Sequence, residues 1–333
     1  MLGFYFEWPK QIKSAVETWS KYYVKGDFDE VVVAGMGGSG IVGDYVQVLS
    51  ATASSGLPVY VTKSHIVPSF VDKSTLFIAI SYSGNTVETL LALRRALERG
   101  AVTVVVSSGG VLEEEARKRN LLYVPVTKGL LPRASLPQML YSVLGLLDAS
   151  GYTIVSRGEA LESAEFLEEN LDECNLLASE LAKWLYEKVI SEGKLVVVAT
   201  HSPLEPLAVR SKNELNENGK VVAKVDVAPE WMHNDIVGYE TPTPRGLGVL
   251  ELVDPDDSVG SKLVDFMEKI YSKQDSTLYR LWLKGKSTLE KLMYGSLVVG
   301  IASVKLAELR GVNPAETPYI AQYKSTTPEI FGH

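Results

Sequence analysis

Short apolar runs alternate with longer amphipathic stretches along most of the chain. Five runs in the first part have the length and the Val and Ile content of buried strands: 30–35, 57–63, 75–81, 101–107 and 121–126. Helical spacing of apolar residues follows the first and third runs, and also precedes the first run over residues 8–24. Strands that alternate with helices predict right-handed βαβ units around a parallel sheet covered on both faces.

The same pattern restarts after a long helical region at 137–193. Strands are expected at 194–200, 224–229, 248–254 and 277–283, and a closing helix over 287–311 should end at Gly311. We therefore predict an α/β fold with two doubly wound parallel-sheet domains flanked by helices. The first domain would include the N-terminal helix and residues 1–150, and the second would include residues 151–333.

The composition and charge of the chain argue against some classes of binding partner. Hydrophobic residues make up 46% of the chain and charged residues 22%, and the net charge of −8 argues against nucleic acid. The single cysteine, Cys174, lies in a helical pattern, which is typical of a packing residue. The N-terminal segment lacks the shape of a signal peptide. The longest apolar stretch, 292–304, is too short to span a bilayer. We expect a soluble, cytoplasmic protein without a membrane partner.

A glycine-rich loop, GMGGSG at 35–40, follows the first strand and matches the G-x-G-x-x-G pattern of dinucleotide-binding turns. That fold also needs an acidic residue at the end of the second strand, to hold the ribose hydroxyls. Thr62, Lys63 and Ser64 occupy this place. The loop therefore lacks the partner that a dinucleotide requires.

A second polar loop follows the strand at 75–81, in the sequence SYSGNT. Ser81, Ser83 and Thr86 surround Gly84 immediately before a helix. Unpaired N–H groups at a helix N-terminus and hydroxyls on a tight turn together favour an anion. Because no G-x-x-x-x-G-K-[ST] motif is present, a monophosphate fits better than a triphosphate. Helix capping alone explains one hydroxyl, whereas three hydroxyls and a glycine favour a phosphate site.

These two loops resemble the sugar isomerase (SIS) domain, a phosphosugar-binding α/β module. Three later segments narrow the resemblance: PRASLP at 132–137, RSKNELNENGK at 210–220 and PEWMHND at 229–235. Together, the five motifs resemble the archaeal bifunctional phosphoglucose/phosphomannose isomerases. The resemblance implies two SIS subdomains, a homodimer, a hexose 6-phosphate substrate and aldose–ketose isomerisation that needs no metal or cofactor.

The resemblance also implies roles for individual residues. Ser81, Ser83 and Thr86 would bind the phosphate, and the glycine-rich loop would lie alongside the sugar through Gly37, Gly38 and Ser39. Glu217 would move the proton between C1 and C2 through a cis-enediol intermediate, since a carboxylate suits this task. Arg133, expected in a loop, would stabilise the enediolate charge.

The same resemblance implies roles for three further residues. His233 would assist ring opening from the partner subunit, and an imidazole can transfer protons in both directions near neutral pH. Lys324 would also assist ring opening. Thr317 would stand where other phosphoglucose isomerases have glutamine, which would leave room for mannose 6-phosphate. The tail after Lys324 has no counterpart in the family pattern.

Other functions remain open at this level. The enzyme could act on glucose 6-phosphate without mannose activity, or on another phosphosugar, and a phosphosugar sensor is also conceivable. The four histidines are scattered at 65, 201, 233 and 333, which with one cysteine predicts no metal cluster. The presence of a base at Glu217 and an acid at His233 favours the isomerase.

Overall fold

The computed structural model describes residues 1–53, 57–243 and 245–332. The chain forms two compact units. The first unit contains Glu7–Glu165 together with the chain from Thr317 onward, and the second contains Met1–Phe6 and Phe166–Glu316. The pattern of the sequence suggested the contiguous ranges 1–150 and 151–333. Instead, each unit includes a helix from the far end of the chain. Tertiary packing, not the local sequence pattern, decides which unit a terminal helix joins.

The first unit is built on a five-stranded parallel sheet. Its strands are β1 (Glu30–Ala34), β2 (Val59–Thr62), β3 (Thr75–Ile80), β4 (Val102–Ser107) and β5 (Leu122–Pro125), in the order β2-β1-β3-β4-β5. Its helices are α2 (Trp8–Glu17), α3 (Gly37–Thr52), α4 (Val87–Glu98), α5 (Gly110–Arg119), the 3₁₀ helix η1 (Pro132–Ser135), α6 (Leu136–Ala149) and α12 (Pro318–Phe331). The helix α7 (Arg157–Glu169) leads into the second unit.

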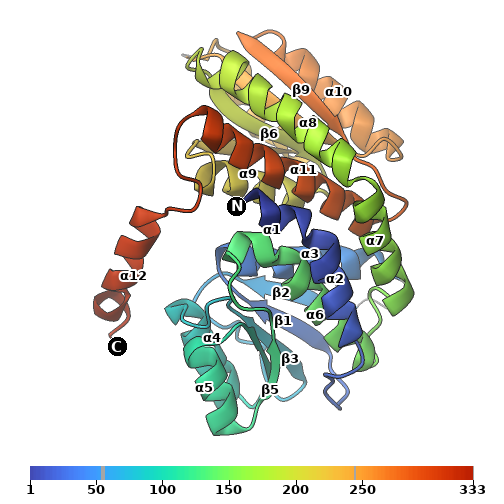
Figure 1. The fold of residues 1–333 in the computed structure, drawn as a ribbon, viewed down its shortest axis with the longest axis vertical. Helices are drawn as coiled ribbons and strands as arrows, with labels where there is room; N and C mark the ends of the chain where they lie inside the picture. Colours follow the sequence, from blue (N-terminus) through green and yellow to red (C-terminus); the bar gives the residue numbers. More distant parts are fainter. Residues whose placement is uncertain (54–56, 244, 333) are drawn as a thin grey trace. The chain divides into compact units, whose positions relative to one another are not determined.

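Both faces of this sheet are covered (Figure 1). Helices α4 and α5 pack on one face, α3 and α6 on the other, and α2 lies against α6. On the α4 and α5 side, the core contains fully buried Phe77 from β3 and Leu93 from α4. Because the strands are apolar on both faces, their carboxyl ends and the loops that follow carry the polar residues of this unit.

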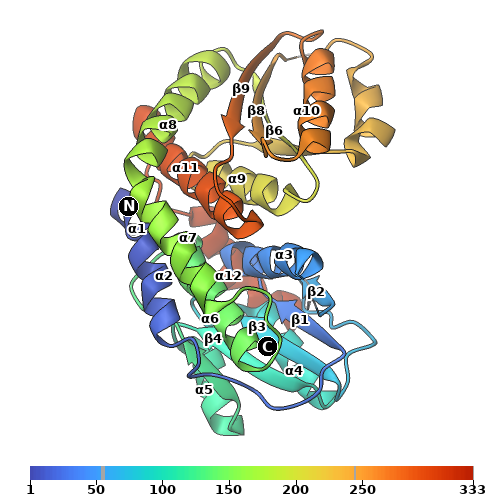
Figure 2. The same cartoon turned by 90° about the vertical axis from the view of Figure 1, so that its right-hand side faces the viewer.

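The second unit is built on a four-stranded parallel sheet. Its strands are β6 (Leu195–His201), β7 (Ala223–Ala228), β8 (Leu247–Val253) and β9 (Ser276–Trp282), in the order β7-β6-β8-β9. Its helices are α1 (Leu2–Phe6), α8 (Leu171–Trp184), the π-helical stretch η2 (Leu185–Ile190), α9 (Glu205–Glu217), the 3₁₀ helices η3 (Glu230–His233) and η4 (Asp235–Tyr239), α10 (Ser258–Tyr271) and α11 (Thr288–Leu309). Figure 2 shows α10 on one side of this sheet and α8, α9 and α11 on the other.

The long apolar helix α11 is the centre of the second unit. It begins with a capping box between Ser287 and Glu290 and packs against α8 and α9. Tyr5 of α1 lies against Gly300, where a β-carbon would come within 2.4 Å of the tyrosine ring. The expectation that this stretch is too short to span a bilayer was wrong, since the helix has 22 residues. However, 83% of its most apolar window is buried inside the structure, as in the core helix of a globular domain.

All nine expected strands are present within two residues of their expected bounds. The helix expected over residues 8–24 ends at Glu17 instead. Trp19 leaves the helical path because its ring packs against Gly145 of α6 and its Nε1 donates to Asp148 at 2.6 Å. Cys174 is buried, and burial raises the pKa of its thiol to about 12, as expected for a packing residue. His333 lies outside the described residues.

Candidate active site

The polar loop after β3 forms a tight hydroxyl-lined turn at the N-terminus of α4. Ser81 is buried, and its Oγ lies 2.9 Å from Oγ1 of Thr86, the N-cap residue of α4. Ser83 is half-buried, and its Oγ accepts from the N–H of Asn85 at 3.3 Å. The first N–H groups of α4 have no carbonyl partner within the helix, and the helix dipole makes this end positive. Hydroxyls and helix N-terminus together have the chemistry of an anion site. We call residues 81–86 the phosphate cradle.

The turn depends on Gly84. Its φ is +70°, which side chains rarely adopt, and a β-carbon there would lie 1.7 Å from the carbonyl oxygen of Gly109. The loops after β3 and β4 therefore touch backbone to backbone at this position. Any larger residue would force the cradle away from its support.

The glycine-rich loop after β1 lies next to the cradle. Gly37 has a φ of +52°, and a β-carbon on Gly38 would lie 3.0 Å from the carbonyl oxygen of Pro132. Ser39 is buried, and its Oγ accepts from the N–H of Tyr82 at 3.1 Å. The hydroxyl of Ser39 thus links the glycine-rich loop to the cradle. Contact of these three residues with a sugar stays a prediction.

Arg133 is not in a loop, as the flanking prolines suggested, but in the 3₁₀ helix η1, where it is only 5% exposed. Its Cα lies against Gly38, at 3.1 Å from a β-carbon built on that glycine. The carbonyl oxygen of the next residue, Ala134, accepts from Nε1 of Trp8 at 3.0 Å and from Nε2 of Gln11 at 3.2 Å. Helix α2 therefore holds η1 against the glycine-rich loop.

Thr317 and Lys324 are on α12, a helix that the sequence pattern did not predict. Thr317 is its N-cap residue, and Lys324 is exposed. The neighbouring Tyr323 donates its hydroxyl to the carboxylate of Glu88, in the first turn of α4. The first unit thus brings together the cradle, the glycine-rich loop, Arg133 and the helix that carries Lys324.

In the second unit, Glu217 is the last residue of α9 and is half-buried. A buried polar network lies one turn before it. Oε1 of Glu214 accepts from Nη2 of Arg210 at 2.5 Å, and its Oε2 accepts from the hydroxyl of Tyr5 at 2.6 Å. Asn218 donates its Nδ2 to Oε2 of Glu214 at 2.8 Å.

This network continues into α11, because Nδ2 of Asn218 also lies 2.9 Å from Oγ of Ser303. Residues of α1, α9 and α11 thereby hold the end of α9 in one position. Arg210, Glu214 and Glu217 all belong to the motif at 210–220 that the sequence singled out. The sequence pattern missed Tyr5, which is 209 residues from Glu214 and has no local signal that could reveal the pairing.

His233 is the last residue of η3 and is exposed. Its segment is anchored by Trp231, which is buried and donates its Nε1 to Oδ2 of Asp226 at 3.0 Å. The hydroxyls of Tyr239 and Tyr271 donate to the same oxygen at 2.9 and 2.7 Å. These buried hydrogen bonds to Asp226 therefore hold the backbone around His233 in place, while the side chain of His233 itself is exposed.

Comparisons with known proteins agree with this arrangement. Residues 27–128 match the SIS domain, and residues 175–326 match the bacterial phospho-glucose isomerase C-terminal SIS domain. A bifunctional phosphoglucose/phosphomannose isomerase from Aquifex aeolicus is 34% identical over 97% of this chain and 95% of the relative. Another from Aeropyrum pernix is 34% identical over 97% of both chains. The chain belongs to this bifunctional phosphoglucose/phosphomannose isomerase family.

The family expected from the sequence motifs is therefore confirmed. A more distant relative, a D-glucosamine-6-phosphate 4-epimerase from Sulfolobus acidocaldarius, is 27% identical over 96% of this chain and 99% of the relative. Solved structures with low identity share the fold. One is the C-terminal domain of glucosamine-fructose-6-phosphate aminotransferase from Francisella tularensis, with a TM-score of 0.74 and 13% identity over 94% of this chain and 97% of that one.

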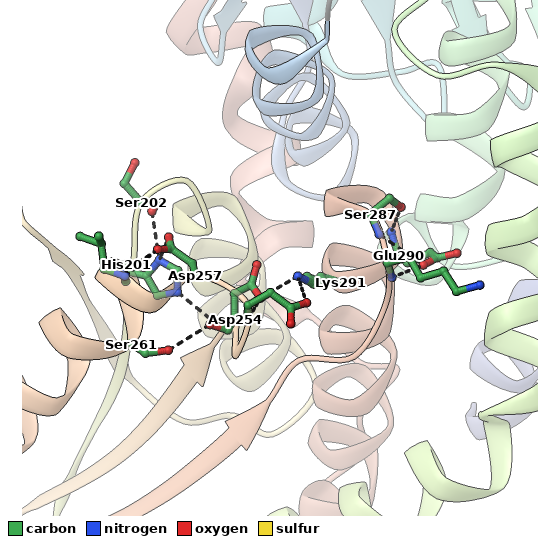
Figure 3. A network of polar contacts seen from close by, with 12 residues as sticks. His201, Ser202, Asp254, Asp257, Ser261, Ser287, Glu290 and Lys291 are labelled. Carbon is green, nitrogen blue, oxygen red and sulfur yellow. Dashed lines mark hydrogen bonds and ion pairs between the residues drawn. The ribbon is translucent and has the colours of Figure 1, made fainter.

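The two SIS sheets of this family member differ at their carboxyl edges. Where the first sheet has the phosphate cradle after β3, the second has Asp254, Asp256 and Asp257 after β8. Nζ of Lys291 lies 2.7 Å from a carboxylate oxygen of Asp254 (Figure 3), and it lies 2.7 Å from one of Asp256 as well. Lys291 pairs with two of these three carboxylates, and Asp257 adds a further negative charge, so this edge is negative, which disfavours phosphate.

His201, at the end of β6, belongs to this second edge. It is 1% exposed, its Nδ1 lies 3.0 Å from the carbonyl oxygen of Ser202, and its Nε2 accepts from the N–H of Asp254 at 3.3 Å (Figure 3). Both ring nitrogens are therefore used in holding loops together. Within the described residues, no group of three or more His, Cys, Asp or Glu could hold a metal ion.

Proposed function

We propose that the protein interconverts glucose 6-phosphate and mannose 6-phosphate with fructose 6-phosphate, as a cytoplasmic homodimer that needs neither metal nor cofactor. The phosphate cradle in the first unit carries this proposal, because it offers three hydroxyls and a helix N-terminus to a tetrahedral anion. The relatives from Aquifex aeolicus and Aeropyrum pernix, both named bifunctional phosphoglucose/phosphomannose isomerases, support the choice of hexose phosphates.

In this proposal, Glu217 is the base. Its carboxylate takes the C2 proton of the open-chain aldose, which gives a cis-enediolate, and returns the proton to C1 while the hydroxyl proton of O2 passes to O1, which forms the ketose. The position of Glu217 at the held end of α9 supports this role, because a base must keep its geometry over both carbons. Its half-buried side chain still has access to a ligand.

Arg133 stabilises the negative charge of the enediolate. A guanidinium keeps its proton throughout the reaction, so it can stabilise charge without exchanging a proton. Its burial supports this role, since charges interact more strongly where water is excluded. Gly37, Gly38 and Ser39 line the sugar beside it, which agrees with the close approach of Gly38 to η1.

Ring opening involves two side chains in this proposal. His233 is donated by the partner subunit, which its exposure on a firmly anchored segment supports. Lys324 polarises the ring oxygen. Thr317 leaves space for the C2 epimer, so that both glucose and mannose phosphates react.

The 4-epimerase relative supports one alternative, which is action on an aminosugar phosphate. The deciding experiment measures fructose 6-phosphate formed from glucose 6-phosphate and from mannose 6-phosphate separately, with a chelator present. We expect turnover of both. Activity on glucose 6-phosphate alone would contradict the proposed role of Thr317 in admitting mannose 6-phosphate. Conversion of glucosamine 6-phosphate alone would favour the alternative.

The substitution Glu217→Gln tests the base. We expect kcat to fall by about 10³-fold with KM little changed, because the amide cannot accept the C2 proton but fills the same space. Glu205→Gln, an exposed residue in the first turn of the same helix, is the matched control and should behave like the wild type. Equal activity of Glu217→Gln and the control would remove Glu217 from the mechanism.

A further inference from the structure

Helix α12 contacts its own unit along one narrow stripe. Tyr323, Thr327 and Phe331 are spaced four residues apart, so they lie on the same face of the helix. Thr327 is the buried residue of this helix, whereas Ile330 on another face is 59% exposed, and Tyr319, one turn before Tyr323, is 84% exposed. With so little buried surface, the position of α12 depends on a few specific contacts.

Two contacts at this stripe reach the carboxyl edge of the first sheet. The hydroxyl of Tyr323 donates to Oε1 of Glu88, and the ring of Phe331 packs edge-on against His65, with 5.3 Å between ring centroids. Glu88 is two residues beyond Thr86 of the cradle, and His65 follows β2. Helix α12, the red C-terminal helix in Figure 1, is therefore tied to the loops after β2 and β3.

The negative charge of Glu88 links its hydrogen bond with Tyr323 to the phosphate cradle. A carboxylate in the first turn favours α4 through the helix dipole, but it also places a negative charge close to a phosphate site. The hydrogen bond to Glu88 raises the pKa of Tyr323. The pair thus couples the start of the cradle helix to the middle of α12.

Lys324 depends on this coupling for its position. It follows Tyr323 directly, it is exposed, and within the described residues its Nζ forms no hydrogen bond or ion pair. A flexible ammonium without contacts of its own is placed by its backbone alone. We propose that Glu88 and Tyr323 are positioning residues, whose hydrogen bond holds α12 so that Lys324 reaches the sugar ring of a substrate bound in the phosphate cradle. This inference rests on the proposed function.

Tyr323→Phe tests the inference, because it removes only the hydroxyl. We expect kcat to fall by roughly five- to tenfold, the range for one ordinary intramolecular hydrogen bond, with KM little changed since the cradle is intact. Tyr319→Phe, at an 84% exposed position one turn earlier in the same helix, is the matched control and should match the wild type. Glu88→Gln should lose less than Tyr323→Phe, because an amide oxygen still accepts the hydrogen bond.

A double-mutant cycle with Lys324→Ala separates positioning from general structural damage. If Tyr323 acts through Lys324, Tyr323→Phe should change kcat no further once Lys324 is alanine. The inference is overturned if Tyr323→Phe equals the wild type, if it has the same effect in both backgrounds, or if Lys324→Ala is fully active. Failure of the proposed function is a separate outcome, seen as no turnover of either hexose phosphate by the wild type.

Discussion

Glu251 is a buried carboxylate outside the proposed catalytic machinery, and its protonation is coupled to folding. It lies on β8 directly opposite Arg280 of β9, and its Oε2 accepts from Nε of Arg280 at 2.7 Å. Within the described residues, its Oε1 has no hydrogen-bond partner. Burial raises the pKa of Glu251 to about 7, although Arg280 opposes this shift.

This pKa predicts how stability changes with pH. The unfolded chain releases the proton near pH 4.5, whereas the folded protein keeps it until about pH 7. Between these values the folded state binds more protons, so this residue's contribution to the free energy of unfolding falls as pH rises, and levels off above pH 7.

Glu251→Gln should remove that contribution. Relative to the wild type, the variant should gain about 3 kcal/mol between pH 4.5 and pH 8, since the pKa rises from 4.5 to about 7 and each pKa unit corresponds to about 1.4 kcal/mol. Urea unfolding at several pH values measures this difference. Parallel stability curves for the two proteins would contradict the prediction.

At the scale of elements, the phosphate cradle is a turn whose shape depends on backbone contact. The loops after β3 and β4 meet at Gly84 and Gly109, and Ser39 of α3 joins the cradle through Tyr82. Three βα connections therefore support one another at the carboxyl edge of the sheet, where parallel strands place their following loops.

Gly84→Ala should disrupt this support. The new β-carbon would meet the carbonyl oxygen of Gly109, so the turn must move and KM for hexose 6-phosphate should rise by roughly tenfold or more. Gly100→Ala is the control, because Gly100 also has a positive φ, of +82°, but a β-carbon there meets nothing within 4 Å. Titration with inorganic phosphate measures the effect directly, and equal phosphate affinity in the two variants would argue against the cradle.

At the scale of the whole molecule, the proposed activity requires residues from two chains. In a dimer, each site would combine Glu217 of one subunit with His233 of its partner. A symmetric dimer repeats this exchange at both sites. The question of which subunit supplies His233 can be answered by mixing inactive variants.

Glu217→Gln and His233→Ala should each be nearly inactive alone. After denaturation and joint refolding in equal amounts, half of the dimers are hybrids and one site in each hybrid has both native side chains. We therefore expect recovery of about a quarter of the wild-type activity. Recovery close to zero, with refolded wild type as the control, would mean that both residues come from the same chain.

The sequence alone determined the strands, the doubly wound class and the family. Buried parallel strands are continuous apolar runs, so a local pattern reveals them. The phosphate cradle and the glycine-rich loop are each a contiguous motif, so a local pattern also reveals the family. Helix α12 escaped prediction because it buries almost nothing and has only a weak amphipathic pattern. Arg133 was placed in a loop because the prolines around it suggested one, whereas packing against α2 makes that segment helical and buried.

Only the tertiary structure decided which distant residues support the site. Tyr5 meets Glu214, Tyr323 meets Glu88, and Gly84 meets Gly109, and none of these pairs is encoded by a local spacing. The acidic edge of the second sheet likewise became interpretable once Lys291 was found between its carboxylates. Periodicity along the chain reports which face of an element is buried, but pairing across the fold depends on the combined packing of all elements.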